Sequence, residues 1–370
     1  MKKVLFIATV VQKHINVFHI PFLKLFQDEG YKTYVAASND TDSQEVTIQH
    51  CDEYVEIDFK RNPLHPGNFS AYFKLKRLIK NNDFDIVHCH TPVGGLLGRL
   101  AARKARKKGT RVFYTAHGFH FYKGASLKNW LFYYPVEKLC SYLTDVLITI
   151  NQEDYELAKK RMKAKQVEYV PGVGIDLSKF ENIQIDRNKK REEIGVPKDA
   201  FLLFSVGELN ENKNHQVVIK ALANINNSNI HYAIAGIGDK KDDLLELANK
   251  LGVSEQMHLL GYRNDIYELN LSADVFCFPS IREGLSVSLM EAMACGLPCA
   301  VSRIRGNIDL IDENGGRTFA ALNEIECTQS IKNLLNSCCS ILGQYNVEKI
   351  KYFGLSIVKD KMRSLYFGDY

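Results

Sequence analysis

Two glutamates frame a predicted helix in the stretch from Cys277 to Ser302. Glu283 lies in a polar loop after an apolar strand pattern, and Glu291 lies eight residues later, within a helical pattern over 286–295. A helix that begins where a parallel strand ends directs free N–H groups and a positive dipole end at an anion, usually a phosphate. A carboxylate also accepts two hydroxyl hydrogen bonds at once, which suits the vicinal hydroxyls of ribose. Taken alone, a capping acid and a solvated helix acid explain the two residues better, so other motifs must decide.

A second group of polar residues follows a strand pattern at Gly207–Lys213, with the sequence GELNENK. Lys213 is expected at the start of a helix over 213–226, where a cation opposes the helix dipole. A lysine in that position indicates an anion beside it, and a surface lysine is an equally good alternative. Gly236 and Gly238 follow the next strand, where a glycine pair could simply form a tight turn.

These motifs in combination resemble a known signature. The spacing E-x7-E, followed by A-x-A-x-G-x-P, is similar to that of the family 4 retaining glycosyltransferases, and the resemblance covers nearly all of the chain. It implies the GT-B fold, with two Rossmann-like α/β domains whose parallel sheets face each other across a cleft. It also implies that Glu291 holds the ribose of a nucleotide-sugar donor. Glu283 and the amides of Gly284 and Leu285 would contact the donor sugar and phosphates.

The resemblance gives Lys213 a role on the donor diphosphate, together with an arginine. Glu208 stands where the family has that arginine, and a carboxylate cannot replace it. Arg282 or Arg263 is therefore expected to supply the second charge, unless Lys213 acts mostly alone. The loop from Gly261 to Asn264 would lie against the nucleobase. The implied donor site consists of Gly207, Glu208, Asn210, Lys213, Gly236, Gly238, Tyr262, Arg263, Arg282, Glu283, Gly284, Leu285, Ser286 and Glu291.

Histidines stand at the ends of the first predicted strands. His117 before Gly118 resembles the family histidine beside donor sugar and acceptor, which gives His117, Lys213 and Glu283 as the catalytic residues. By the same resemblance, His14, His19 and His120 are expected at the acceptor, and a core role is the alternative for each.

His88 and His90 alternate on one strand. They have no third ligand nearby in the sequence, so no metal site is predicted. The run HGFHFYKG over 117–124, with Asn129-Trp130, resembles the capsule and exopolysaccharide branch of the family.

The implied reaction is transfer of a sugar, with retention, from a nucleoside-diphosphate sugar, expected to be UDP-linked, to a lipid-linked saccharide. Helix N-termini, Lys213 and an arginine would stabilise the departing diphosphate, so no cofactor or metal is expected. The front-side scheme of the family requires no protein nucleophile. One alternative is a sugar-nucleotide 2-epimerase of the same architecture. Another is a non-catalytic sugar-nucleotide-binding subunit of a glycan-synthesis complex. This alternative remains because Glu208 stands where the family has an arginine.

Short apolar strands alternate with helices in both halves of the 370-residue chain, as in parallel sheets covered on both faces. We expect strands at 4–8, 33–37, 54–57, 86–89, 112–115, 146–150, 202–206, 231–235, 257–260, 275–278 and 299–302. Helices are expected near 16–29, 69–81, 93–107, 127–143, 152–163, 213–226, 240–251, 265–272, 286–295 and 345–367. The glycines and proline of Tyr169–Asp176 indicate a hinge. The expected domains are therefore 1–170 for the acceptor, 171–345 for the nucleotide sugar, and a C-terminal helix in 346–370 that packs back on the first domain.

Charge is distributed unequally: residues 1–170 carry a net charge of +9 and residues 171–370 a net charge of −4. Seven basic residues crowd the end of one predicted helix, and a second basic helix over 69–81 also carries aromatic residues. Such clusters attract anionic lipid, and no nucleic-acid reading motif accompanies them. We expect a cytoplasmic enzyme that is peripherally bound to the inner face of the cell membrane. The seven residues are Arg99, Arg103, Lys104, Arg106, Lys107, Lys108 and Arg111.

Overall fold

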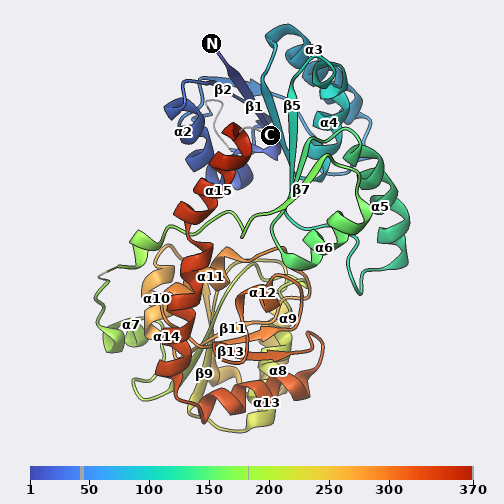
Figure 1. Cartoon of the computed structure of the whole chain (residues 1–370). Helices are drawn as coiled ribbons and strands as arrows, with labels where there is room; N and C mark the ends of the chain where they lie inside the picture. Colours follow the sequence, from blue (N-terminus) through green and yellow to red (C-terminus); the bar gives the residue numbers. More distant parts are fainter. Residues whose placement is uncertain (42–45, 182, 369–370) are drawn as a thin grey trace. The chain divides into compact units, whose positions relative to one another are not determined.

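The computed structural model describes residues 1–41, 46–181 and 183–368. It contains two compact units, each with helices on both faces of a parallel sheet (Figure 1). The first unit comprises Met1–Val173 and Val358–Tyr370, and the second comprises Gly174–Ile357. The chain thus passes between units within the predicted hinge segment, and it returns to the first unit at Val358.

The first unit has a seven-stranded sheet in the order β3-β2-β1-β4-β5-β6-β7, with every pairing parallel. Leu5 of β1 lies opposite Tyr34 of β2 on one side and Val87 of β4 on the other. The strands are β1 (Lys3–Val10), β2 (Lys32–Ser38), β3 (Glu53–Glu56), β4 (Ile86–His90), β5 (Arg111–Ala116), β6 (Val146–Thr149) and β7 (Gln166–Tyr169).

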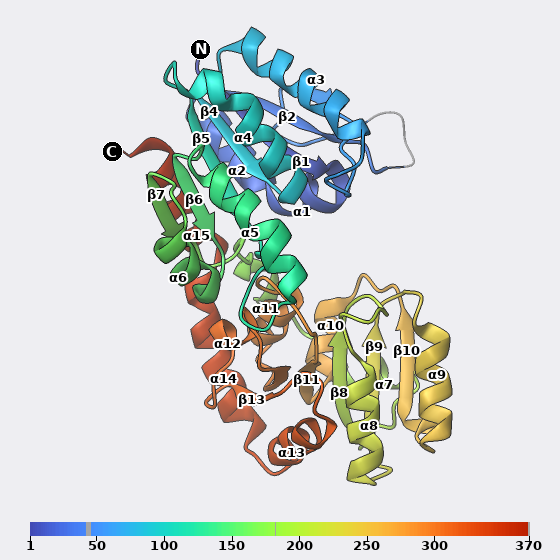
Figure 2. The same cartoon turned by 90° about the vertical axis from the view of Figure 1, so that its right-hand side faces the viewer.

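Helices on the two faces of this sheet enclose separate apolar cores. One core contains side chains of α2 and α15, and the other contains side chains of α3, α4 and α6. Figure 2 shows α3, α4 and α5 following one another along one side of the sheet. The helices are η1 (Val11–Ile15), α1 (Asn16–Phe18), α2 (Ile20–Asp28), α3 (Gly67–Asn82), α4 (Pro92–Arg106), α5 (Leu127–Ser141), α6 (Gln152–Arg161) and the shared α15 (Leu355–Phe367).

The second unit has a six-stranded parallel sheet in the order β10-β9-β8-β11-β12-β13. Its strands are β8 (Phe201–Val206), β9 (Ile230–Ala235), β10 (Met257–Gly261), β11 (Val275–Phe278), β12 (Cys299–Ser302) and β13 (Gly316–Phe319). Its helices are η2 (Leu177–Phe180), α7 (Arg187–Glu193), α8 (Gln216–Ile225), α9 (Lys241–Lys250), η3 (Ser254–Gln256), α10 (Ile266–Ser272), α11 (Val287–Ala294), α12 (Asn307–Leu310), α13 (Glu324–Leu335), α14 (Cys339–Ile350) and η4 (Lys351–Phe353).

Strand order reverses once in each sheet, between β1 and β4 in the first unit and between β8 and β11 in the second. The connections on either side of such a point lead to opposite faces of the sheet, which leaves a crevice at the carboxyl ends of the two strands. The histidines that follow β1 and end β4 therefore meet at one crevice. Lys213 and Glu283, which follow β8 and β11, meet at the other.

All predicted strands are confirmed, and the two that sequence reasoning missed, β7 and β13, are edge strands. Edge strands are half exposed, so they lack the continuous apolar run of a central strand. The helix expected over 16–29 is interrupted at His19, with a proline in the first turn of α2. Lys213 does not begin a helix, because Asn214 has a positive φ of 53° and α8 starts at Gln216. Across the described ranges, no helix is both long and apolar enough to cross a bilayer.

Candidate active site

Lys213 and Glu283 form an ion pair at the β8/β11 crevice of the second unit. Nζ of Lys213 donates to Oε1 of Glu283 at 2.8 Å, and both side chains are less than one-fifth exposed. The same Nζ lies 4.6 Å from the centroid of the Phe278 ring. Oδ1 of Asn210 accepts from the backbone N–H of Lys213 at 3.0 Å, which fixes the loop. Two predicted catalytic residues, 70 positions apart in the sequence, are thus brought together.

Glycines allow the loops of this crevice to touch backbone to backbone. A Cβ on Gly236 would lie 1.9 Å from the carbonyl oxygen of Gly207, and one on Gly238 would lie 2.3 Å from that of Leu209. Gly306 has a φ of +77°, and its Cβ would lie 2.1 Å from the carbonyl oxygen of Gly284. The loops after β8, β9, β11 and β12 can therefore approach this closely only with glycine at positions 236, 238 and 306.

Helix α11 begins beside this pair and carries the second glutamate. Ser286 caps the helix by accepting from the N–H of Leu289 at 3.4 Å. Burial raises the pKa of Glu291 to about 7, against an opposing contribution from the charge of Lys179. A half-buried carboxyl group just over one turn into the helix fits the predicted role of a hydroxyl acceptor.

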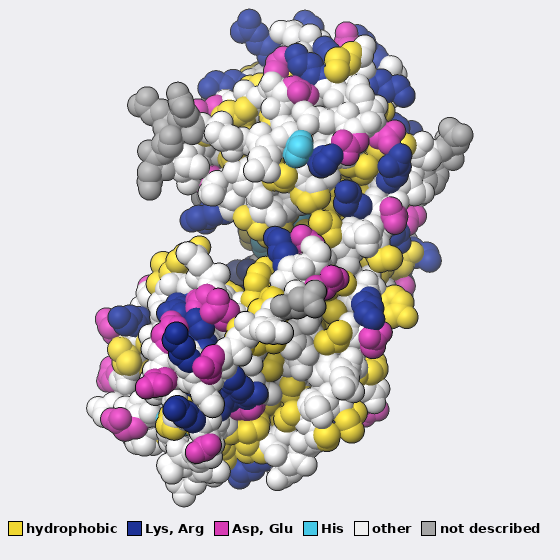
Figure 3. Space-filling model, turned by 90° about the vertical axis from the view of Figure 1, so that its left-hand side faces the viewer, with side chains coloured by type: hydrophobic (Ala, Val, Ile, Leu, Met, Phe, Trp, Pro, Cys, Tyr) yellow, Lys and Arg dark blue, Asp and Glu magenta, His cyan; other side chains and the backbone are white. Residues whose placement is uncertain are grey.

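The basic residues of this unit differ in their availability. Arg263 is an expected candidate for the missing diphosphate arginine, and Asp265 and Glu193 hold its guanidinium in this structure. The face of the second unit in Figure 3 carries basic and acidic side chains intermixed in this way. Arg282 is exposed beside Glu283 and remains the candidate. Sequence reasoning missed Arg305, which is 5% exposed and precedes the close Gly306–Gly284 contact.

The remaining predicted donor residues lie in loops of the same unit. Glu208 is exposed and accepts a hydrogen bond from Asn210. Tyr262 is 75% exposed after β10, and Gly261 accepts from the N–H of Gly236 at 2.8 Å. The structure therefore connects the expected nucleobase loop directly to the glycine pair.

The β1/β4 crevice of the first unit contains a hollow of about 350 Å³. His14 and His120 line this hollow, whereas His19 is 2% exposed and does not line it, and its acceptor contact stays a prediction. The ring of His120 stacks on Tyr133 with centroids 4.5 Å apart. Other lining residues include Thr9, Lys13, Arg61, Thr91 and Pro92.

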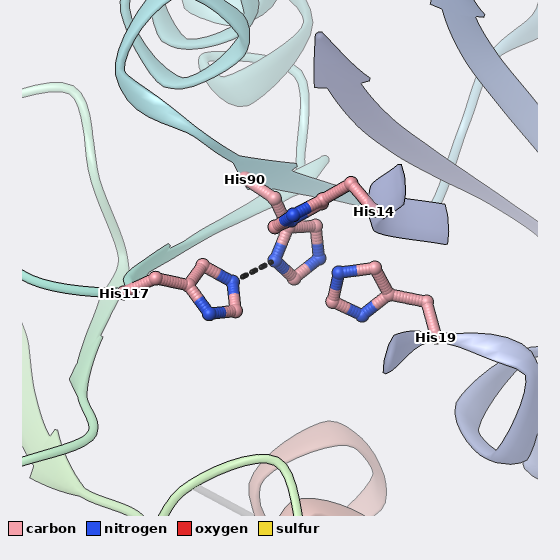
Figure 4. Close-up of side chains that lie close together, drawn as sticks. All are labelled: His14, His19, His90 and His117. Carbon is pink, nitrogen blue, oxygen red and sulfur yellow. Dashed lines mark hydrogen bonds between the residues drawn. The ribbon is translucent and has the colours of Figure 1, made fainter. Parts of the chain in front are cut away.

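Four histidine rings converge next to this hollow (Figure 4). His14, His19, His90 and His117 each offer one nitrogen, and these four atoms lie within 4.8 Å of one another. Such a set of nitrogens could hold a metal ion. Sequence spacing hid the set, because its members come from η1, the residue before α2, the end of β4 and the loop after β5.

Three of the seven basic residues expected at a membrane have structural roles instead. Arg99 is fully buried and donates to Glu137 at 2.8 Å. Arg106 pairs with Asp145 at 3.0 Å. Arg111 donates to the carbonyl oxygens of Leu365 and Tyr366 at the end of α15. Four exposed cations are left at the end of α4: Arg103, Lys104, Lys107 and Lys108.

Helix α5, which contacts α4, turns its apolar side outward. Its Glu137 binds the buried Arg99 of α4, while large hydrophobic side chains repeat at helical spacing on the exposed side. This arrangement reverses the usual pattern of a surface helix. The apolar face of α5, as we call it, consists of Leu127 (72% exposed), Leu131 (65%), Phe132 (69%), Val136 (40%), Leu139 (68%) and Tyr142 (54%).

Comparisons with known proteins agree with this architecture. The family models "Glycosyl transferase 4-like" and "Glycosyl transferases group 1" match residues 3–151 and 186–340. EpsD of Bacillus subtilis strain 168, assigned as a glycosyltransferase, is 39% identical over 99% of this chain and 96% of its own. The UDP-Gal:α-D-GlcNAc-diphosphoundecaprenol α-1,3-galactosyltransferase of Escherichia coli is 29% identical over 80% and 81%. Anabaena HepE, solved with UDP and glucose, superposes with a TM-score of 0.82 over 99% of both chains at 18% identity. The chain therefore belongs to the family 4 glycosyltransferases of the GT-B fold.

Proposed function

We propose that this glycosyltransferase moves a hexose from a UDP-sugar, with retention, to a saccharide carried on a lipid diphosphate at the surface of an anionic membrane. The observation that carries the proposal is the Lys213–Glu283 pair at the β8/β11 crevice, 2.8 Å apart and mostly buried. It combines a cation for a diphosphate with a carboxylate for sugar hydroxyls, next to the N-terminus of α11.

On the donor side, each group has a role in binding or in charge stabilisation. Glu291 accepts the ribose hydroxyls, and Glu283 with the amides of Gly284 and Leu285 contacts the sugar and phosphates. When the glycosidic bond breaks, negative charge grows on the diphosphate, and Lys213, Arg282 and the N-terminus of α11 stabilise it. In this scheme no metal ion bridges the donor phosphates.

On the acceptor side, we assign the hollow of the first unit to the lipid diphosphate and its saccharide. Lys13 and Arg61 contribute positive charge, and α4 starts at Pro92 in the wall of the hollow. A helix N-terminus favours an anion. His14 and His120 would contact the saccharide, and His117 would lie beside the reacting sugar. The Escherichia coli relative acts on a saccharide linked to diphosphoundecaprenol, which supports this class of acceptor.

One further feature supports the reaction type. That relative makes an α-1,3 linkage from UDP-Gal, which is itself an α-linked donor, so its reaction retains the anomeric configuration. Retention without a protein nucleophile lets the departing phosphate accept the proton of the acceptor hydroxyl. We therefore assign no general base to the protein.

The test of this function is a panel of UDP-sugars incubated with and without an undecaprenyl-diphosphate-linked saccharide. We expect UDP release only when the acceptor is present, and a product with the α configuration by NMR. Activity should be the same with and without added Mg²⁺ or Mn²⁺. Isomerised donor in the absence of acceptor would identify an epimerase, and donor binding without turnover would identify a binding subunit; either result contradicts the proposal.

The apolar face of α5 and the four exposed cations of α4 give the membrane contact. We infer that the apolar face enters the interfacial region of a bilayer, while Arg103, Lys104, Lys107 and Lys108 attract anionic headgroups. Each basic residue near such a surface contributes about 1 kcal/mol. The positive charge of these four residues favours anionic lipid over a second copy of this unit, because two copies would bring like charges together.

We expect the double variant L131D/F132D to bind anionic vesicles at least about tenfold more weakly, because burying each such side chain contributes about 1.5–3 kcal/mol. Co-sedimentation with phosphatidylglycerol-containing vesicles measures the effect. The matched control is L322D/I325D in the second unit, where both side chains are 75% exposed. Unchanged binding of the α5 variant would rule out that helix, and absence of wild-type binding at low salt would rule out membrane association.

A further inference from the structure

The four-histidine cluster of the first unit has a geometry that packing alone does not explain. Nδ1 of His90 lies 3.4 Å from Nε2 of His117, the one hydrogen bond between the four rings in Figure 4. The rings of His19 and His90 lie 3.8 Å apart by centroid, and those of His14 and His117 lie 4.8 Å apart. All four rings therefore point toward a common centre, from four different segments of the chain.

Several nitrogens of this cluster are buried and unsatisfied. Within the described part of the chain, Nε2 of His14, both ring nitrogens of His19 and Nε2 of His90 have no hydrogen-bond partner. A buried polar atom without a partner destabilises the folded chain. One bound metal ion can satisfy one nitrogen of each ring, so it relieves part of this cost.

The neighbouring His88 is a histidine with a structural role, and its hydrogen bonds can be compared with those of the cluster. Its Nδ1 bonds to the hydroxyl of Tyr366 at 2.7 Å, and its Nε2 bonds to Oγ1 of Thr115 at 2.8 Å. Both nitrogens are therefore satisfied by the protein, although the ring lies only 4.0 Å from that of His90 by centroid. The same core could have supplied such partners to His19 and His90, yet it does not.

The chemistry of the set favours a borderline transition-metal ion. The set offers only imidazole nitrogens, and imidazole is the commonest metal ligand among protein side chains. Nitrogen ligands without a carboxylate suit Zn²⁺ rather than Mg²⁺ or Ca²⁺. Tetrahedral zinc with Zn–N bonds of about 2.0–2.1 Å separates its ligand nitrogens by roughly 3.4 Å, as His90 and His117 are separated here.

We propose that His14, His19, His90 and His117 bind one Zn²⁺-class cation in the first unit. This site differs from the sequence expectation of no metal, which weighed His88 and His90 but not this set of four. It is also separate from the donor diphosphate in the second unit. Because His14 lines the hollow as well, a bound divalent ion adds positive charge to the wall that already contains Lys13 and Arg61.

The test uses metal binding as its readout, so it is independent of whether transfer activity is found. The full chain is stripped with a chelator, dialysed against Zn²⁺ or Co²⁺, and analysed by elemental mass spectrometry and visible spectroscopy. We expect about one metal ion per chain, as for a four-ligand protein site, and the intense visible bands of tetrahedral cobalt. H19F should abolish both signals.

Two further variants keep the result interpretable if H19F fails to fold. H14C exchanges one ligand for another at a partly exposed position, so it should retain the ion and add a thiolate-to-cobalt absorption band. H258Q removes one ring of the His231–His258 pair in the second unit, whose nitrogens lie 2.9 Å apart, and should leave the stoichiometry unchanged. Absence of stoichiometric metal in the wild type, loss of the metal in H258Q, or no new band in H14C would each overturn the proposal.

Discussion

Replacing Lys213 with alanine is expected to lower kcat about 10²–10³-fold while the KM for the donor changes much less. Removing one group that stabilises developing charge in a dry site has effects of this size. The ammonium group interacts more strongly with the departing diphosphate than with the intact donor, so the loss falls mainly on the transition state. Steady-state kinetics with a UDP-sugar and a lipid-linked acceptor measure the effect.

The ion pair requires its own control, because K213A leaves the carboxylate of Glu283 without its partner at 17% exposure. The double variant K213A/E283Q removes that unpaired charge, and it should show a loss of kcat at least as large as that of K213A. K240A is a matched surface control in the same unit, where the lysine pairs with Asp243. A purely KM effect in K213A would show that Lys213 contributes to ground-state binding alone.

Donor affinity is expected to fall as the pH drops below 7, and E291Q should remove this dependence. Burial raises the pKa of Glu291 to about 7. The ribose hydroxyls bind best to the ionised carboxylate, so binding below pH 7 must first release a proton, with a limit of about tenfold per pH unit. Above pH 7, E291Q should bind a UDP-sugar about 10–100-fold more weakly, the equivalent of about 1.5–3 kcal/mol.

Calorimetric titration between pH 6 and 8 tests this, because the phosphates of a UDP-sugar remain ionised throughout. An E291Q variant with the wild-type pH profile would place the titrating group elsewhere.

The raised pKa of Glu291 also affects the stability of the fold. The folded-state pKa exceeds the unfolded value of 4.5, so the stabilisation that is present below pH 4.5 is lost as the pH rises through 7. At 1.36 kcal/mol per pKa unit this is about 3 kcal/mol, and E291Q should raise the Tm of the second unit at pH 8 but not at pH 4.

The central parts of both sheets could be predicted from sequence, because buried parallel strands such as β1, β4, β8 and β11 are continuous apolar runs. Edge strands lack this signal. Gln166–Tyr169 alternates half-buried residues, and Gly316–Phe319 contains an arginine and a threonine. Local backbone conformation was also not predicted. The positive φ of Asn214 delays the start of α8.

The placement of Glu283 before a helix and of Glu291 within it was predictable, because one motif places both residues in a single segment. The sequence could not show which basic residues are free to bind a ligand, because ion pairs with distant acidic residues decide this. In the sequence, Arg99 and Arg263 look like free surface cations. In the structure, Arg99 is buried and paired with Glu137, and Arg263 is paired with Asp265. The histidine cluster was missed for the same reason, since four separate segments build it.

The last helix has a consequence for how the protein is made. Val358, Met362, Leu365 and Tyr366 of α15 complete an apolar core of the first unit, and Tyr366 bonds to His88 across 278 residues. The ribosome synthesises these residues only after the entire second unit. During translation the first unit therefore has an uncovered apolar face, and exposed apolar surface of this kind is prone to aggregation. A fragment that stops at Val173 would retain that face permanently, so residues 1–173 should not be obtainable as a well-behaved isolated domain.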